Sequence, residues 1–144
     1  PGGGRARRFK ARSARAMLRG MTARPRHIPA ARSAPFAPRE RCAITEVIND
    51  PAFPGASLAL AEVGAGITTE RHALDVAEAY LIVSGRGRME AGDLTAEGGP
   101  GDAGVIPAGA PQRITALGDA PLVFHCLCAP RFTPDGYTPL EDAP

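Results

Sequence analysis

Residues 66–85 read GITTERHALDVAEAYLIVSG, a stretch in which polar and apolar side chains alternate between two glycines. Side chains two residues apart on a β-strand point to the same face, so His72 and Leu74 share one face. On the strand expected next, Glu78 and Tyr80 share a face in the same way. The stretch therefore predicts two short strands that each turn a polar side chain toward one side of a sheet.

Similar short strands, separated by turns, are expected on both sides of this stretch. The 17 glycines and 15 prolines suit many tight turns, and no helical period survives beyond one turn. Eight to nine strands are predicted, within residues 42–50, 56–63, 64–74, 77–85, 85–93, 103–109, 110–121 and 122–130. Residues 94–102 are expected to form a turn region, and residues 131–144 a tail across the surface. This pattern predicts an all-β sandwich or barrel.

Charge divides the chain into two unlike parts. Residues 1–41 hold eleven Arg and one Lys against one Glu, for a charge of +11, and residues 42–144 hold five Arg against fourteen acids, for −9. The first part has the Arg, Pro, Gly and Ser composition of a disordered segment. A leader or otherwise processed extension, with Met21 as the true start, is the favoured interpretation. A transit peptide and a nucleic-acid-binding arm are the alternatives. Residues 42–144 are predicted to be the folded domain.

The three cysteines favour a reducing, cytoplasmic compartment, because their number is odd and no secretory signal is evident. Cys126 and Cys128 should share one strand face, as core fillers in the favoured interpretation and as thiols or soft-metal ligands in the alternative. His125 should face the other way. The longest apolar run, AYLIV, is far below the roughly 18 residues that span a bilayer. No phosphate-binding loop, dinucleotide fingerprint or nucleophile elbow is present.

The glycines of the opening stretch belong to a longer spacing. Gly66, His72, Glu78 and Gly85 are separated by five, five and six residues, and Leu74 lies two residues after the histidine. This spacing resembles the first motif of the cupin family, whose members carry a second histidine where Leu74 stands. The family consists of small jelly-roll barrels with a site inside.

A second spacing resembles the other motif of the cupin family. Gly101, Pro107 and Gly109 match its glycine and proline positions, whereas Gln112 and Ala116 stand where the family has histidine and asparagine. The resemblance covers roughly residues 42–134. The segments PAGAPQRI and CLCAPRF are similar to those of a group of small single-domain bacterial cupins. The resemblance implies an all-β, cupin-type jelly-roll β-barrel over residues 42–144, preceded by a disordered basic N-terminal arm.

Strand alternation brings three polar residues together if the barrel closes. His72, Glu78 and Gln112 would then point inward, and an imidazole, a carboxylate and an amide oxygen can hold a divalent metal ion. Mn, Fe, Ni and Zn are candidates, and the oxygen donors favour Mn or Fe. Tyr80 is the candidate for proton transfer, or else a half-buried strand aromatic. Glu70 shares the His72 face and is expected at the rim, or else as a further donor in the site. In the alternative, the three polar groups bond one another without an ion.

The resemblance implies a metal-dependent cupin that acts on or binds a small organic molecule. Oxygenase, lyase and isomerase chemistry all occur on this fold, and the fold does not select among them. The alternative is a non-catalytic small-molecule-binding or sensor protein with a degraded metal site. A homodimer that pairs through an edge strand is the expected assembly, with no membrane partner and no nucleic acid in the favoured interpretation.

Overall fold

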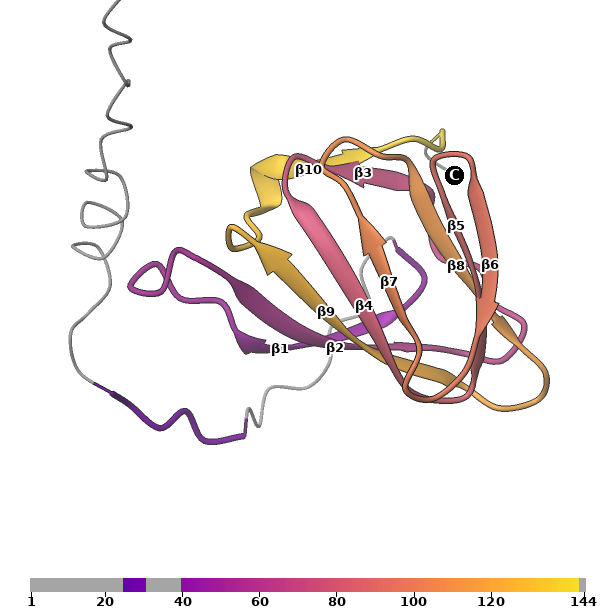
Figure 1. The fold of residues 1–144 in the computed structure, drawn as a ribbon, viewed down its shortest axis with the longest axis horizontal. Helices are drawn as coiled ribbons and strands as arrows, with labels where there is room; N and C mark the ends of the chain where they lie inside the picture. Colours follow the sequence, from indigo (N-terminus) through magenta and orange to yellow (C-terminus); the bar gives the residue numbers. More distant parts are fainter. Residues whose placement is uncertain (1–24, 31–39, 143–144) are drawn as a thin grey trace, which may run out of the picture.

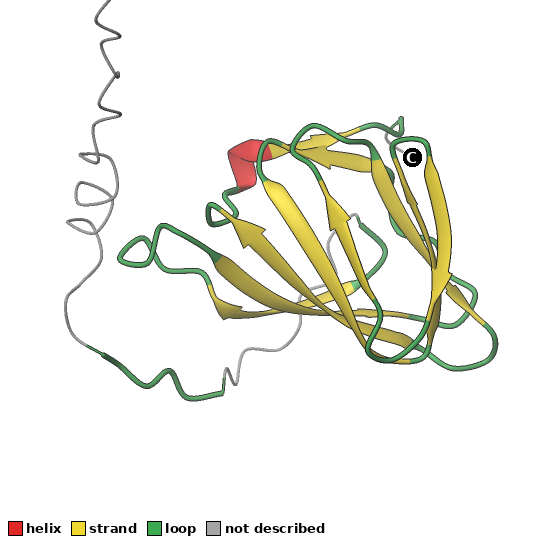
Figure 2. Cartoon of the chain, in the orientation of Figure 1, coloured by secondary structure: helices red, strands yellow, loops and turns green. Residues whose placement is uncertain are grey.

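The computed structural model describes residues 25–30 and 40–142, and residues 43–139 form two antiparallel β-sheets that face each other (Figure 1). The strands are β1 (Ala43–Ile48), β2 (Ser57–Val63), β3 (His72–Leu74), β4 (Ala77–Ser84), β5 (Arg86–Ala91), β6 (Leu94–Gly98), β7 (Ala103–Ile106), β8 (Gln112–Leu117), β9 (Leu122–Ala129) and β10 (Tyr137–Pro139). A short 3-10 helix, η1 (Pro134–Gly136), precedes the last strand and is the only helix drawn in Figure 2 for the described residues. None of their helices is long and apolar enough to cross a membrane.

The order of strands in each sheet departs from their order in the chain. Sheet A has the order β1-β2-β9-β4-β7, and sheet B has the order β10-β3-β8-β5-β6. Long connections therefore cross between the sheets, as in a jelly roll. The crossings place β3 beside β8 and β4 beside β9, so that residues far apart in the chain share one interior.

Aliphatic side chains fill the space between the two sheets. Ile106, Ile114, Leu122 and Val63 are the largest fully buried hydrophobic residues. Alternation explains their positions, because one face of each strand points inward. The chain has no tryptophan, so aliphatic side chains fill most of the core volume. The core is continuous, and Ala61, Tyr80, Ile82 and Phe124 belong to the same cluster.

The structure confirms the predicted all-β jelly-roll barrel and corrects two of its elements. Residues 94–98, predicted to lie in a turn region, form β6 and pair with β5 from Ala91 opposite Leu94 to Gly87 opposite Gly98. Most of β6 is exposed at a sheet edge, so it shows none of the apolar alternation that marks the other strands. Part of the predicted surface tail forms β10 and pairs with β3, which raises the count to ten strands in the described residues.

The predicted basic arm lies for its greater part outside the described residues. Its last two residues contact the barrel. The Arg41 guanidinium donates to the Thr68 carbonyl oxygen at 2.8 Å and pairs with the Glu141 carboxylate at 2.9 Å. The backbone carbonyl of Glu40 accepts a hydrogen bond from the Glu70 amide. These contacts bring the end of the arm to one mouth of the barrel.

Candidate functional site

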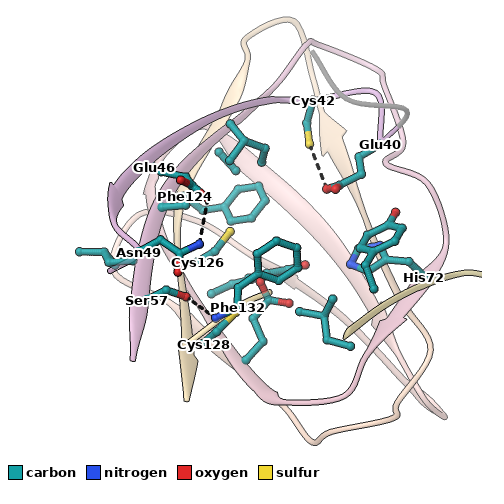
Figure 3. A pocket seen from close by; sticks show the side chains of 18 of the residues that line it. Glu40, Cys42, Glu46, Asn49, Ser57, His72, Phe124, Cys126, Cys128 and Phe132 are labelled. Carbon is teal, nitrogen blue, oxygen red and sulfur yellow. Dashed lines mark hydrogen bonds between the residues drawn. The ribbon is translucent and has the colours of Figure 1, made fainter. Parts of the chain in front are cut away.

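A cavity of about 320 Å³ lies between the sheets, at the end of the barrel where β1 ends and β2, β3 and β4 begin (Figure 3). Its wall is mostly apolar, with a few polar groups that come from separate strands. The lining residues that carry the argument below are Glu40, Cys42, Glu46, His72, Leu74, Glu78, Tyr80, Phe124, Cys126, Cys128, Phe132 and Tyr137. In Figure 3, Glu40 and His72 lie on one side of the cavity, and Cys126, Asn49 and Ser57 on the other.

His72 opens β3 and is held by two contacts that orient its ring. Its Nδ1 lies 2.9 Å from the backbone carbonyl oxygen of Glu70, and its ring stacks on Tyr137 with centroids 4.6 Å apart. Burial lowers the pKa of His72 and so favours the neutral ring, although the Glu70 carbonyl and the Glu70 charge act in the opposite direction. A neutral ring that donates from Nδ1 leaves Nε2 as an acceptor, and no described residue donates to it.

Hydrogen bonds join three polar side chains at the cavity wall, Glu78, Gln112 and Tyr80. The Gln112 amide nitrogen donates to Glu78 Oε2 at 2.9 Å, and the Tyr80 hydroxyl donates to Gln112 Oε1 at 3.0 Å. Gln112 is 1% exposed and does not line the cavity, whereas Glu78 and Tyr80 do. Each side chain in the chain therefore has a partner, as buried polar groups require.

Burial changes the ionisation of Glu78 and Tyr80. Removal from water raises the pKa of Glu78 to about 7, although the Gln112 amide and the Cys128 and Cys126 thiols oppose the rise by donating hydrogen bonds. The carboxyl of Glu78 is thus divided between its neutral and charged forms near neutral pH. Burial, with Glu78 as the next contributor, raises the pKa of Tyr80 well above its ordinary range, so the hydroxyl keeps its proton.

Three thiols also face this cavity. The sequence prediction that Cys126 and Cys128 share a face is confirmed, and they stand opposite Tyr80 and Glu78 in the pairing of β9 with β4. Burial raises the pKa of Cys128 and of Cys42 to about 12, with Glu78 and Glu40 respectively adding to the rise. The thiols are therefore protonated and act as small, weakly polar wall groups, not as nucleophiles.

The charged groups that line the cavity are all acidic. Glu40, Glu46 and Glu78 contribute carboxyl groups, and no Arg or Lys lines it among the described residues. Burial, followed by the nearby charge of Glu70, raises the pKa of Glu40. The Asn49 amide donates to Glu46 at 3.0 Å, so this acid already has a neutral partner. The cavity offers acceptors and acids but no cation.

The donor groups fit a metal ion poorly. Leu74 is buried where a second imidazole would stand, so His72 supplies one nitrogen. The side-chain oxygen of Gln112 is the atom that would bind a metal ion, but it accepts a hydrogen bond from the Tyr80 hydroxyl instead. The side-chain nitrogen of Gln112 donates to Glu78. Within the part of the chain that the structure describes, no three His, Cys, Asp or Glu side chains are grouped to hold a metal. These four residue types do not include amides, so the metal site predicted at His72, Glu78 and Gln112 stays a prediction.

Two residues of the cavity wall were missed by sequence reasoning. Glu40 belongs to the segment whose composition predicted disorder, and its position next to β1 was the only available signal. Tyr137 belongs to the segment expected to be a surface tail, but it stacks on His72 and donates to Glu70 at 2.7 Å. Glu70 itself is buried, not at the rim as predicted, because Tyr137 covers it. Arg113 faces outward, as the alternation indicates, and pairs with Glu90.

Comparison with known proteins identifies the barrel. Residues 58–128 match the cupin domain family, and no curated protein sequence matches the chain. The oxalate decarboxylase of Lactobacillus farciminis, solved as a formate complex, is 25% identical, with a TM-score of 0.62 over 70% of this chain and 32% of its own. An oxalate decarboxylase of Bacillus subtilis is 16% identical, with a TM-score of 0.70 over 84% of this chain and 34% of its own.

A smaller protein shows the same likeness. KdgF from Halomonas sp. is 19% identical, with a TM-score of 0.57 over 64% of this chain and 82% of its own. The chain spans about a third of the length of the two oxalate decarboxylases, and its likeness to the B. subtilis enzyme and to KdgF is one of fold. The family match over residues 58–128 and the strand order agree, and this part of the chain is a domain of the cupin family.

Proposed function

We propose that the protein binds a small, largely apolar organic molecule in the cavity, and that this molecule is uncharged or positively charged. The observation that carries the proposal is the wall itself: a cavity of about 320 Å³ is lined mainly by apolar side chains and acids, with no Arg or Lys among the described lining residues. Volumes of a few hundred cubic ångströms and mainly apolar walls are typical of small-molecule sites.

Charge decides which molecules suit this wall. An anion would have to leave water for a cavity that holds Glu78 and Glu40 and offers no opposite charge, which is costly at low dielectric. A ligand with an amine or a hydroxyl could instead donate to the free His72 Nε2 or to Glu78. The small-molecule partner predicted from the sequence is thereby narrowed to molecules with a hydrogen-bond donor and an apolar body.

Binding of this kind needs no metal ion. In a metal-binding cupin site, inward polar side chains are satisfied by the ion, whereas Gln112 here joins Glu78 to Tyr80 by hydrogen bonds. This observation favours the non-catalytic binding or sensor function over the metal-dependent one. The predicted cytoplasmic location suits three free thiols, two of them buried.

A metal-dependent enzyme is the second candidate, favoured by the 25% identity to an oxalate decarboxylase and by the unpartnered Nε2 of His72. His72, Glu78 and Gln112 would hold Mn, Fe, Ni or Zn, which would supply a Lewis acid. Gln112 would first have to release the Tyr80 hydroxyl, and Tyr80 would then be free for the proton transfer predicted from the sequence. Oxygenase, lyase and isomerase activities remain open for this candidate.

Three probes of similar shape test the proposal: naphthalenemethanol, naphthalenemethylamine and naphthoate. Each is titrated against the full chain, whose metal content is measured beforehand. We expect the alcohol and the amine to bind at least about ten-fold more tightly than the acid. His72→Ala should weaken binding, and Glu97→Gln, on the exposed face of sheet B, should not. Binding should survive a chelator. Near-stoichiometric metal together with loss of binding after chelation would replace the proposal with the metal-dependent candidate.

A further inference from the structure

The acceptors that the cavity leaves free lie on its opposite sides. Among the polar groups of the wall, the Ser57 hydroxyl accepts from a backbone amide at 2.9 Å, and Glu78 accepts from a side-chain amide at 2.9 Å. Free acceptors remain at His72 and Glu40 on one side and at Glu46 on the other (Figure 3). We name these the inner end, formed by His72 and Glu40, and the outer end, formed by Glu46.

The inner end holds hydrogen-bond acceptors and lacks a strong donor. His72 is 6% exposed and lines the cavity, and its Nε2 has no donor among the described residues. The carboxyl of Glu40 is half-buried, and its one donor within the described residues is the Cys42 thiol at 3.9 Å, which is a weak donor. Glu70 joins the two, because its amide donates to the Glu40 carbonyl and its carbonyl accepts from His72 Nδ1. An ammonium group, with three N–H donors, suits this end.

The outer end carries an acid at a position where packing alone favours an apolar residue. Cys42, Ile44 and Glu46 alternate along β1, and all three line the cavity. Glu46 is exposed, and its Oε1 accepts from the Asn49 amide at 3.0 Å, whereas its Oε2 has no donor in the part of the chain that the structure describes. Arg131 donates to the Asn49 oxygen at 2.9 Å but does not line the cavity. The outer end therefore offers a carboxylate to a ligand.

The strand geometry gives the distance between the two ends. Glu46 stands opposite Ala59, Ala59 opposite Cys126, and Cys126 opposite Tyr80, so that small side chains form the floor between them. The Cα atoms of Cys42 and Glu46, four residues apart on β1, are separated by roughly 13 Å. A hydrogen bond of about 2.8 Å at each end leaves roughly 7 to 8 Å between two donor nitrogens. This separation corresponds to an extended chain of about six carbon atoms.

We propose that the occupant of the cavity carries an amine at each end of an apolar chain and belongs to the class of α,ω-diamines. This inference rests on the proposed function and narrows it from one donor group to two. One ammonium contacts His72 Nε2 and the Glu40 carboxyl at the inner end. The other contacts Glu46 at the outer end, and the carbon chain lies along the small and apolar side chains between them.

Charge favours an amine at both ends. Glu40, Glu46 and Glu78 line the cavity without an Arg or Lys among the described residues, so one ammonium still leaves acids in excess. Because the inner end is enclosed, its contacts contribute most of the affinity. Glu46 is exposed, and an ion pair in water changes affinity only a few-fold. The outer end therefore sets the preference for two amines over one.

Calorimetric titration of the full chain with diaminohexane, hexylamine and hexanoate tests the inference. A symmetric diamine can enter in either orientation, so the ratio of hexylamine Kd to diaminohexane Kd is compared between variants. We expect Glu46→Gln to lower this ratio at least about three-fold. Glu62→Gln, on the exposed face of the neighbouring strand β2, is the matched control and should leave the ratio unchanged. Glu40→Gln should weaken binding of both amines at least about ten-fold.

A measurement on the unaltered chain covers the case in which a variant does not fold. Because Glu46 is exposed, the same ratio should fall as salt is added. A ratio that neither Glu46→Gln nor salt changes would overturn the inference and leave Glu46 as an inward charge that protects the edge strand β1 from pairing. The proposed function would survive that result if hexylamine still bound more tightly than hexanoate. Equal binding of hexylamine and hexanoate, or binding of neither amine, would overturn both.

Discussion

Glu78 should make the protein less stable as the pH rises through neutrality. Its pKa is about 7 in the folded barrel, against an ordinary value of 4.5. The folded state thus holds a proton between these values that the unfolded chain releases, so stability falls as pH increases. The contribution of Glu78 to the free energy of unfolding is fully present below pH 4.5 and is lost above about pH 7. Between pH 5 and pH 8 the loss is on the order of 2 to 3 kcal/mol.

Glu78→Gln isolates this contribution, because the substituted side chain stays neutral and can still accept from Gln112. The free energy of unfolding in urea is measured for both proteins from pH 5 to pH 8. The unaltered protein should lose on the order of 2 to 3 kcal/mol relative to the variant over that range. Groups that do not interact with Glu78, such as His72, titrate in both proteins and cancel in the difference.

Glu97→Gln controls for the loss of a surface carboxylate, since Glu97 lies on the exposed strand β6 and pairs only with Arg86 in the described residues. Its pH profile should run parallel to that of the unaltered protein. Parallel profiles for Glu78→Gln would refute the reasoning, because they would mean that burial does not hold a proton on Glu78.

Two further substitutions test the geometry on which the site rests. Tyr80→Phe removes the hydroxyl that donates to Gln112 and should cost about 1 to 2 kcal/mol in urea unfolding, because the amide oxygen loses its partner. An unchanged free energy would show that this bond is absent in solution. Gly85→Ala should cost at least about 3 kcal/mol, since φ is +79° and the new Cβ would overlap the Pro121 carbonyl oxygen. Gly92→Ala, at φ +58° with open space around it, should cost only about 1 kcal/mol; equal losses would contradict the overlap.

The backbone was the predictable part of this protein. Gly85 and Gly109 both have φ of +79°, which other residues rarely adopt, so their spacing encodes turns directly. Alternation likewise assigned the inward faces of β4 and β9 correctly, including Cys126 and Cys128. These signals are local, and each depends on a few neighbouring residues. Strand β6 was not predicted, because an exposed edge strand has no buried face and so shows no alternation of apolar and polar residues.

The completed site was less predictable because its contacts are long-range. Tyr137 meets His72 only through the pairing of β10 with β3, and that pairing cannot be read from either segment alone. Glu40 enters the wall from a segment whose average composition is that of a disordered chain. Which way the Gln112 amide faces depends on both Glu78 and Tyr80, more than thirty residues away. The motif spacing predicts where a side chain lies in the barrel, whereas its hydrogen bonds depend on residues that only the folded structure brings next to it.

The two departures from the family motifs act together. Leu74, at one histidine position, removes a nitrogen donor and adds a buried apolar group to the cavity wall. Gln112 at the other histidine position supplies the missing donor, because its amide reaches Glu78 while its oxygen accepts from Tyr80. The amide therefore suits a barrel that satisfies its buried carboxyl through hydrogen bonds, and the cavity beside it is left to a ligand.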